Sequence, residues 1–268
     1  YLPQASANVA FYKMLYVPHN IDFLAAAAQM EGRSAASLLA TRGLASHLGP
    51  EMLRQMPGFD FLLNRALWTL LHFGRTTEVL AEPLPPEEFA YASAMAHVGR
   101  GLALVRLGRL GEASTELEAA EKSMAGVREG AMQGLNPAQP LGSIGLDLLA
   151  GELLIAQGGD GVETGLTRLR AAVAAEDGSV YDEPADWYFP TRHLLGSAQL
   201  RLGRSVDAEK TFQEDLERNR ENGWALAGLV RALTIQGKTS EAEPVRVRLG
   251  VAWARADLGL ERVIAGPP

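Results

Sequence analysis

The chain has 268 residues, of which 47% are hydrophobic and none is cysteine, with 25 lysines and arginines against 32 aspartates and glutamates. This acidic balance leaves no excess of basic groups to neutralise phosphates, so nucleic acid is not expected as a partner. Without cysteine, disulfides, thiolate metal sites and thiol nucleophiles are excluded, and either a cytoplasmic or a periplasmic location fits. No apolar run approaches the roughly 18–20 residues that span a bilayer, and Tyr1-Leu2-Pro3 reads as the middle of a helix, so residues upstream are expected.

Apolar residues recur at helical spacing along the chain and predict an all-α fold of helical hairpins. Within an N-terminal part, residues 1–125, the predicted helices are 20–29, 34–47, 61–73, 88–107 and 112–124. Asn20 is the expected cap of the first helix. The three prolines between residues 83 and 86 are expected to cut one hairpin short, because proline lacks the amide hydrogen and clashes with the preceding turn.

Residues 126–142 contain several glycines and two prolines and predict a linker that interrupts the regular stacking. The C-terminal hairpins are expected within residues 143–260, at 144–157 with 163–175, at 191–218 and at 222–257. A polar, aromatic loop at 176–190 separates the first of these hairpins from the other two. Residues 261–268 are expected to form a tail.

Two pairs of turn glycines share one spacing, since Gly74 precedes Gly108, and Gly203 precedes Gly237, by 34 residues. That is the period of the tetratricopeptide repeat, a unit of two antiparallel helices. Glycine suits the turns because it adopts positive φ at little cost, and at Gly196 it would let two helices approach closely. The pattern therefore predicts an α-solenoid of tetratricopeptide-like hairpins wound into a right-handed superhelix.

Residues 181–192 differ from the rest of the chain, because four aromatic residues, three acids and Arg192 are concentrated in and just after one loop. This combination is typical of a pocket with flat apolar walls and a few oriented polar groups. The alternative is that the aromatic residues plug the end of the repeat stack. Asn222-Gly223-Trp224 begins the next repeat at the equivalent place, so both clusters are expected to face one site.

The predicted ligand-binding residues are Tyr181, Glu183, Trp187, Tyr188, Arg192, Asn222 and Trp224. The aromatic rings would stack on the ligand, Arg192 would pair with a carboxylate or phosphate, and Asn222 would orient the ligand by hydrogen bonds. No nucleophile elbow is present, so nothing in the sequence indicates nucleophilic catalysis.

The five histidines include no pair at the spacing of a helical zinc site. His47, His72 and His97 are interpreted as solvated or hydrogen-bonded imidazoles, and His193 is a candidate for ligand contact because it follows Arg192. His19 is the candidate metal ligand, with a packed imidazole beside a helix cap as the alternative.

Four segments resemble a family of bacterial tetratricopeptide-repeat proteins, largely uncharacterised. They are Tyr-x-Pro-His-Asn-x-x-Phe-Leu at 16–24, Tyr-x-Glu-Pro-x-x-Trp-Tyr-x-Pro-x-Arg at 181–192, Asn-Gly-Trp at 222–224 and Trp-Ala-Arg-Ala-Asp at 253–257. The resemblance covers nearly the whole chain and implies a bacterial protein with a helical-repeat fold. In the family a His-Met-Pro-Ser-His segment lies upstream, in a part that this chain does not contain. A site joining that segment to His19 would hold a divalent metal.

The expected function is a repeat scaffold that binds a peptide, a protein or a small molecule on its concave, loop-lined surface, without chemistry of its own. The alternative is part of a metal-dependent enzyme, a hydrolase or an oxygenase, that uses His19 with upstream residues. A purely structural adaptor is the third reading. An upstream segment or a partner chain is expected to pack on the N-terminal hairpin.

Overall fold

The computed structural model describes residues 16–265 and is helical through most of that range. Within that range about 13 helices pack as sequential pairs and 73% of the residues are helical, which confirms the all-α prediction. Within the described range the only strands are two short ones of two residues each, which pair with each other.

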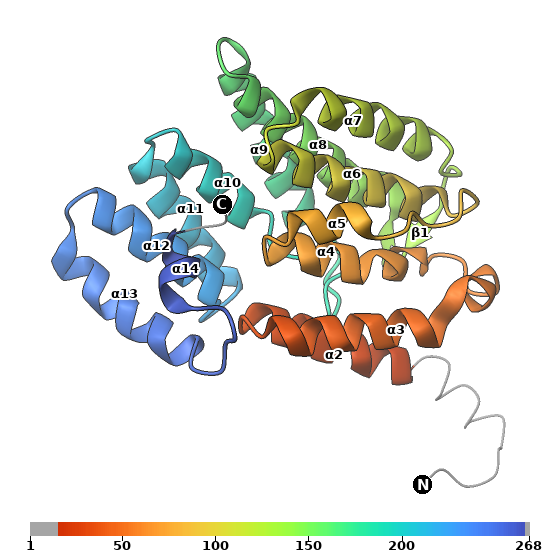
Figure 1. The fold of residues 1–268 in the computed structure, drawn as a ribbon, viewed down its shortest axis with the longest axis horizontal. Helices are drawn as coiled ribbons and strands as arrows, with labels where there is room; N and C mark the ends of the chain where they lie inside the picture. Colours follow the sequence, from red (N-terminus) through yellow and green to blue (C-terminus); the bar gives the residue numbers. More distant parts are fainter. Residues whose placement is uncertain (1–15, 266–268) are drawn as a thin grey trace, which may run out of the picture.

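The N-terminal helices follow one another closely along the chain and, from α2 to α7, occupy the lower and right parts of Figure 1. They are α2 (Val17–Met30), α3 (Ser34–Arg54), the 3₁₀ helix η2 (Asp60–Asn64), α4 (Arg65–His72), α5 (Thr76–Ala81), α6 (Ala90–Arg106) and α7 (Leu110–Ala125).

The C-terminal elements begin with a short antiparallel strand pair. They are β1 (Met132–Gln133), β2 (Asn136–Pro137), α8 (Ala138–Gln157), α9 (Gly161–Asp177), α10 (Arg192–Arg201), α11 (Ser205–Arg218), α12 (Gly223–Ile235), α13 (Thr239–Ala252) and α14 (Leu260–Ala265). Neighbours in sequence contact each other, α8 with α9, α10 with α11 and α12 with α13, as expected for helical hairpins.

Five of the hairpin turns share one backbone conformation, and the α8–α9 turn differs because it contains Gly158 and Gly159. Five glycines at these turns have φ between 71° and 73°: Gly32, Gly74, Gly108, Gly203 and Gly237. The prediction that glycine occurs at these turns because it adopts positive φ at little cost is confirmed.

Gly196 has a different role, in packing. A Cβ on Gly196 of α10 would lie 2.5 Å from Cζ of Phe212 in α11, and one on Gly228 of α12 would lie 2.3 Å from the same atom. The Phe212 ring therefore fits between two glycines, which allows three helices to approach one another.

The first helix begins earlier than predicted. It starts at Val17, and Pro18 occupies its first turn, where the missing amide hydrogen costs no hydrogen bond. Asn20 consequently lies inside the helix, and its predicted role as a cap is wrong.

The predicted linker is shorter than expected. Residues 132–137 form the strand pair, and α8 already begins at Ala138, with Pro140 in its first turn. The buried core continues through this region, since Ala138 and Leu141 belong to one cluster with Met95 and Leu195. The division of the chain at 126–142 stays a prediction.

The predicted tail starts with a helix. Residues 261–265 belong to α14, which packs on α12 through the buried side chain of Val263. Residues 266–268 lie outside the described range.

The first hairpin contacts the end of the last one. The carboxylate of Asp257 accepts hydrogen bonds from Ser34 N at 2.8 Å, Ser34 Oγ at 2.7 Å and Ala35 N at 2.8 Å, and so caps α3. The Trp253 ring packs on Gly32, where any Cβ would overlap it. Figure 1 shows the α13–α14 connection beside the start of α3. The segment 253–257 thus joins the two ends of the described fold.

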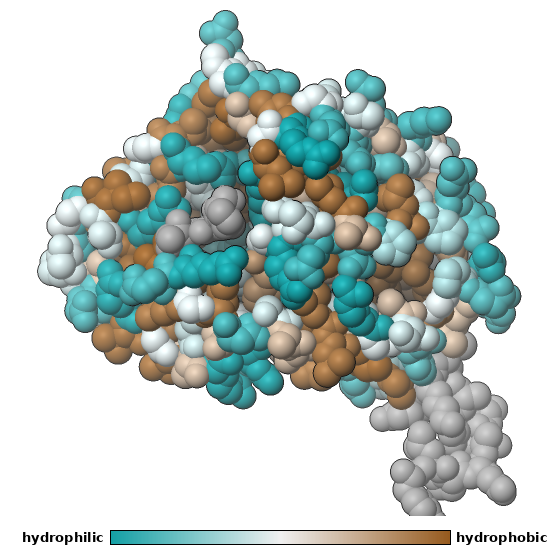
Figure 2. Space-filling model, viewed as in Figure 1, coloured by the Kyte–Doolittle hydropathy of each residue, from teal (hydrophilic) through white to brown (hydrophobic). Residues whose placement is uncertain are grey.

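The outer surface indicates no membrane-spanning element. None of the helices within residues 16–265 combines the length and the apolar content needed to cross a bilayer. On the face drawn in Figure 2, hydrophobic residues occur in small groups separated by hydrophilic ones.

Candidate functional site

The aromatic residues of the loop after α9 lie in the core. Trp187, Tyr188 and Phe189 are 4%, 5% and 3% exposed. All three rings surround Trp68 of α4, with the Tyr188 ring stacked on it at 4.5 Å between centroids. The three rings are therefore packed in the core, as the alternative interpretation predicted. They anchor the loop to the N-terminal helices.

The same loop also lines a cavity of about 620 Å³, which we call the loop cavity. Helix α2 supplies its opposite wall, and the ends of α9 and α11 close it. Its loop residues include Tyr181, Glu183, Trp187, Tyr188 and Arg192, five of the predicted binding residues. A volume of this size is in the range of small-molecule sites.

Residues at the mouth and the floor of the loop cavity differ in exposure. Tyr181 is 77% exposed, and its hydroxyl donates a hydrogen bond to Glu183, which is also exposed. Trp187 and Tyr188 form the floor. Trp187 Nε1 has no hydrogen-bond partner within residues 16–265.

The loop is held by polar contacts from a distant segment. Asn136 Oδ1 accepts from Val180 N at 2.7 Å, and Asn136 Nδ2 donates to Asp186 Oδ2 at 2.7 Å. Burial raises the pKa of Asp186 above its usual range. Asn136 lies in the predicted linker, 44 residues from Val180, and no local pattern in the sequence marks its contact with the loop.

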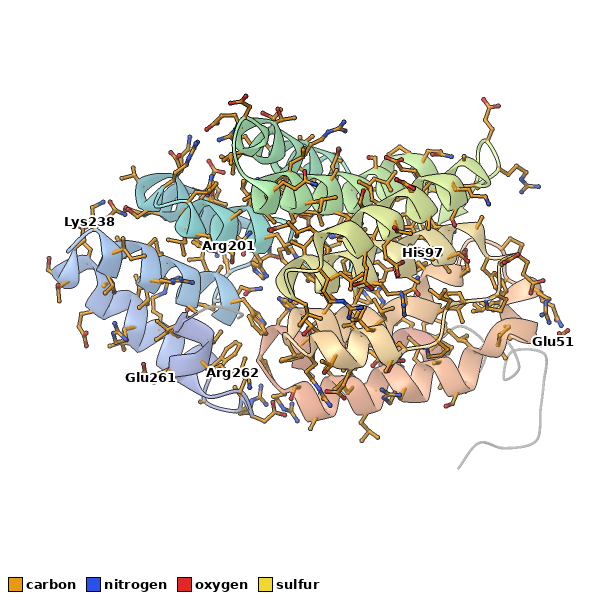
Figure 3. All side chains as sticks on the ribbon, turned by 45° about the horizontal axis from the view of Figure 1, so that its top comes forward. Glu51, His97, Arg201, Lys238, Glu261 and Arg262 are labelled. Atoms are coloured by element: carbon orange, nitrogen blue, oxygen red, sulfur yellow. The ribbon has the colours of Figure 1, made fainter. Side chains whose placement is uncertain are left out.

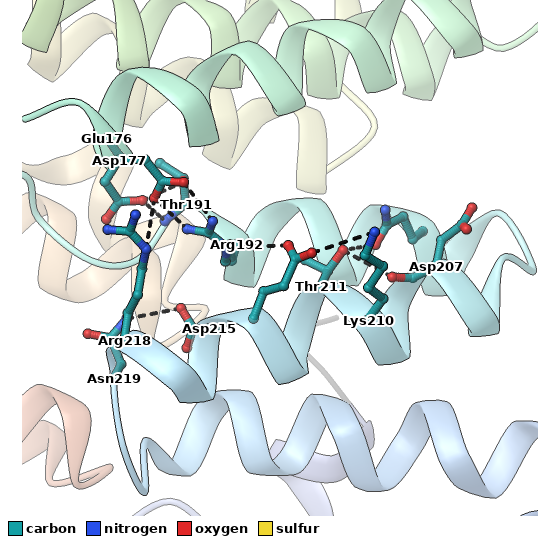
Figure 4. A network of polar contacts seen from close by, with 12 residues as sticks. Glu176, Asp177, Thr191, Arg192, Asp207, Lys210, Thr211, Asp215, Arg218 and Asn219 are labelled. Carbon is teal, nitrogen blue, oxygen red and sulfur yellow. Dashed lines mark hydrogen bonds and ion pairs between the residues drawn. The ribbon is translucent and has the colours of Figure 1, made fainter.

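Arg192 is paired within the protein. Its guanidinium donates to both carboxylate oxygens of Asp177, at 2.7 Å each, and Asp177 also lies 3.3 Å from Arg218 Nε (Figure 4). The hydrogen bonds from Arg192 lower the pKa of Asp177. The expected pairing of Arg192 with an anionic ligand therefore has a competitor inside the chain, and the ion pair joins the start of α10 to the end of α9.

Carboxylates outnumber guanidinium groups around the loop cavity. The lining contains six acids, Glu176, Asp177, Asp182, Glu183, Asp186 and Asp215, and three arginines, Arg65, Arg192 and Arg218. One of these arginines, Arg65, is engaged by Asp22 at 2.8 Å outside the cavity. Burial raises the pKa of Glu176 and Asp186, and Asp177 is paired with Arg192 and Arg218, so the negative charge offered to a ligand is that of Asp182 and Glu183 at the mouth.

Asn222 and Trp224 lie elsewhere. The side chain of Asn222 accepts hydrogen bonds from Trp224 N and Ala225 N, so it caps α12. Trp224 Nε1 donates to Gln29 O at 2.9 Å, and the Trp224 ring lines a second cavity. The two predicted clusters thus come close to each other but line separate cavities.

Two histidines connect these cavities. His72 stacks on Phe189 at 4.3 Å and on Trp224 at 4.2 Å, and its Nε2 lies 3.3 Å from His193 Nδ1. His193 Nε2 in turn lies 3.4 Å from Asp215 Oδ2, within ion-pair distance.

Burial and the neighbouring His193 lower the pKa of His72 well below its usual range, so His72 is neutral at pH 7. As expected of a hydrogen-bonded imidazole, His72 Nδ1 also lies 2.8 Å from Gln29 Nε2. Similarly, His97 Nδ1 lies 2.6 Å from Glu116 Oε2.

His19 is exposed on α2, with its ring 5.9 Å from that of Phe23. It borders a small cavity of about 90 Å³ together with Asp22 and Asp182. The part of the chain that the structure describes contains no group of three or more histidine or acidic side chains arranged to hold a metal. The upstream histidines that the resemblance implies lie outside this chain, so the metal site stays a prediction.

The comparisons with known proteins assign no family. No protein-family model matches the chain, no curated protein matches its sequence, and no solved structure matches its fold. What is shown is an all-helical protein whose helices pack as consecutive pairs.

Proposed function

We propose that the protein is a tetratricopeptide-like repeat protein that binds a peptide or a small ligand carrying positive charge in the loop cavity. The observation that supports this most is that one segment, residues 180–192, supplies the aromatic floor of the cavity and the carboxylates at its mouth. The same segment was singled out by its composition.

The repeat architecture is supported by the turns. The 34-residue spacing of two glycine pairs is the period of tetratricopeptide hairpins, and the φ near 72° at five glycines shows that these hairpins turn in the same way. We accordingly propose a short right-handed α-solenoid whose first hairpin has come into contact with its last. The loop cavity lies between α2 and the ends of α9 and α11.

The charge of the cavity favours a cationic ligand. Asp182 is half-buried and Glu183 is exposed at the cavity mouth, and neither carboxylate forms an ion pair within the described range. Both are available to a lysine, an arginine or an amine. The aromatic floor adds a surface on which the apolar part of a cation packs favourably.

Calorimetric titration with the tripeptide Lys-Trp-Lys tests this proposal, with Glu-Trp-Glu as the probe of opposite charge. Lys-Trp-Lys should bind more tightly. The double variant Asp182→Asn with Glu183→Gln should weaken Lys-Trp-Lys binding about three- to tenfold, as expected for the loss of two accessible carboxylates.

The matched control removes two exposed acids from α7, Glu118→Gln with Glu121→Gln, and changes the net charge equally. It should leave the affinity unchanged. Equal binding of the two tripeptides, or equal weakening by the two double variants, would contradict a site at the loop cavity.

A further inference from the structure

The second cavity has the opposite charge to the loop cavity. It measures about 420 Å³ and lies where α4, α6, α8, α10, α11, α12 and α14 meet. Its ionised lining groups are Arg106, Arg201, Arg231 and Glu152, three cations against one anion. We call it the arginine cavity.

Arg106 ends α6 and has no carboxylate partner. Its Nη1 donates to Leu71 O at 2.5 Å, and no acidic side chain of the described range lies within ion-pair distance of it. Loss of water around the guanidinium lowers the pKa of Arg106 to about 10, so it remains charged at pH 7. Glu152 in the same lining attracts Arg106 but is itself paired with Arg201, so an anionic ligand would give Arg106 a direct partner.

Arg231 is also unpaired. It lies half-buried on α12, and within residues 16–265 its side chain makes no hydrogen bond and no ion pair. Arg201, by contrast, is paired with Glu152. Figure 3 shows Arg201 at the junction between the C-terminal helices and the rest of the molecule.

The remaining walls are mostly apolar. They include Leu102, Val105, Ile155, Leu194, Phe212 and Trp224. A ligand that fits both kinds of wall has a compact anionic group and a hydrophobic body.

We propose that the arginine cavity binds a small organic anion, with its carboxylate or phosphate group between Arg106 and Arg231 and its apolar part against Trp224 and Phe212. Guanidinium groups bind both kinds of oxyanion in two-pronged geometry. This site is independent of the proposed function, because the loop cavity is rich in acidic residues and no residue lines both cavities.

Calorimetric titration of the full chain with octanoate, octyl phosphate and octylammonium tests the proposal. The two anions should bind and octylammonium should not. Binding of either anion supports the proposal, and the tighter one identifies the preferred head group. If neither binds, or if octylammonium binds equally well, the proposal is overturned.

Arg231→Met should weaken binding of the anion about ten- to hundredfold, as expected when a charged hydrogen bond is lost. Arg231 has no partner to leave unpaired, so the variant should fold normally, which thermal unfolding would verify. The matched control is Arg170→Met, which removes an exposed arginine from α9 that forms no ion pair within residues 16–265. Equal affinities of the two variants would overturn the assignment.

The Lys-Trp-Lys titration separates this inference from the proposed function. Arg231→Met should leave Lys-Trp-Lys affinity unchanged, and the Asp182→Asn, Glu183→Gln variant should leave octanoate affinity unchanged. The titrations can therefore contradict one proposal and leave the other standing.

Discussion

The loop cavity and the arginine cavity lie on either side of His193 but are built in different ways. The loop cavity owes its character to one continuous segment, residues 180–192, and its surplus charge is negative. The arginine cavity is assembled from seven helices, some of which contribute only one side chain, and its surplus charge is positive. A binding site made by one loop leaves a local signal in the sequence, whereas a site made where helices converge leaves none.

The largest expected effect comes from removing the floor of the loop cavity. Trp187→Ala should lower the free energy of unfolding by about 3–5 kcal/mol, since it deletes a buried ring that packs on Trp68. Urea denaturation followed by circular dichroism measures this. Leu135→Ala, at a position 53% exposed, should cost less than about 1 kcal/mol.

Trp187→Ala also sharpens the comparison of the cavities. Under conditions where the variant is folded, it should lose Lys-Trp-Lys binding and keep octanoate binding. Loss of both ligands from a folded variant would show that the cavities are not separate.

A smaller effect is expected beside the arginine cavity. Gly196→Leu should destabilise the protein by about 1–3 kcal/mol, because the Phe212 ring is confined between Gly196 and Gly228 and has little room to move. Octanoate binding should weaken, since Phe212 lines the cavity, while Lys-Trp-Lys binding should not.

Gly111→Ala provides the control for that substitution. Gly111 lies in α7, and a methyl group added there would have no neighbouring atom within 4 Å, so alanine should be neutral or stabilise by about 0.5–1 kcal/mol. Similar unfolding midpoints for the two glycine variants would refute the packing argument.

The smallest effect concerns the ion pair at the end of α9. Arg192→Ala should cost about 1–2 kcal/mol at pH 7, because it removes the two hydrogen bonds to Asp177. The pKa of Asp177 is lowered in the folded state, so the pair stabilises the protein above the ordinary carboxyl pKa of 3.8 and its contribution is lost as the pH falls below that value.

The cost of Arg192→Ala should therefore be larger at pH 7 than at pH 3 when urea midpoints are compared. Arg168→Ala breaks an exposed pair with Asp147 and should cost less than about 0.5 kcal/mol at either pH. A cost for Arg192→Ala that does not depend on pH would argue against the ion pair as its source.

Much of the fold could be predicted from local patterns. The turn glycines and the apolar spacing identified the hairpins, because both depend on residues close together in sequence. The start of α8 was missed because proline usually interrupts a helix, whereas Pro140 lies in a first turn, where proline is tolerated. The contact of Asp257 with Ser34 was missed because it joins residues 223 positions apart.

The site was predictable to a lesser degree. Tyr181 and Glu183 stood out because aromatic and acidic residues are concentrated around them. The pairing of Arg192 with Asp177, however, depends on how α9 and α10 meet. Arg106 and Arg231 are ordinary helix residues in the sequence, and only the packing of α6 and α12 around one cavity distinguishes them.

The most direct test of two separate cavities of opposite charge is a titration of Lys-Trp-Lys in the absence and in the presence of saturating octanoate. If each ligand has its own cavity, the peptide affinity should change by less than about twofold, since the two ligands do not compete. The stoichiometry should be one peptide and one octanoate per chain. A loss of peptide affinity in proportion to the octanoate concentration would show that both ligands compete for one site and would contradict the account.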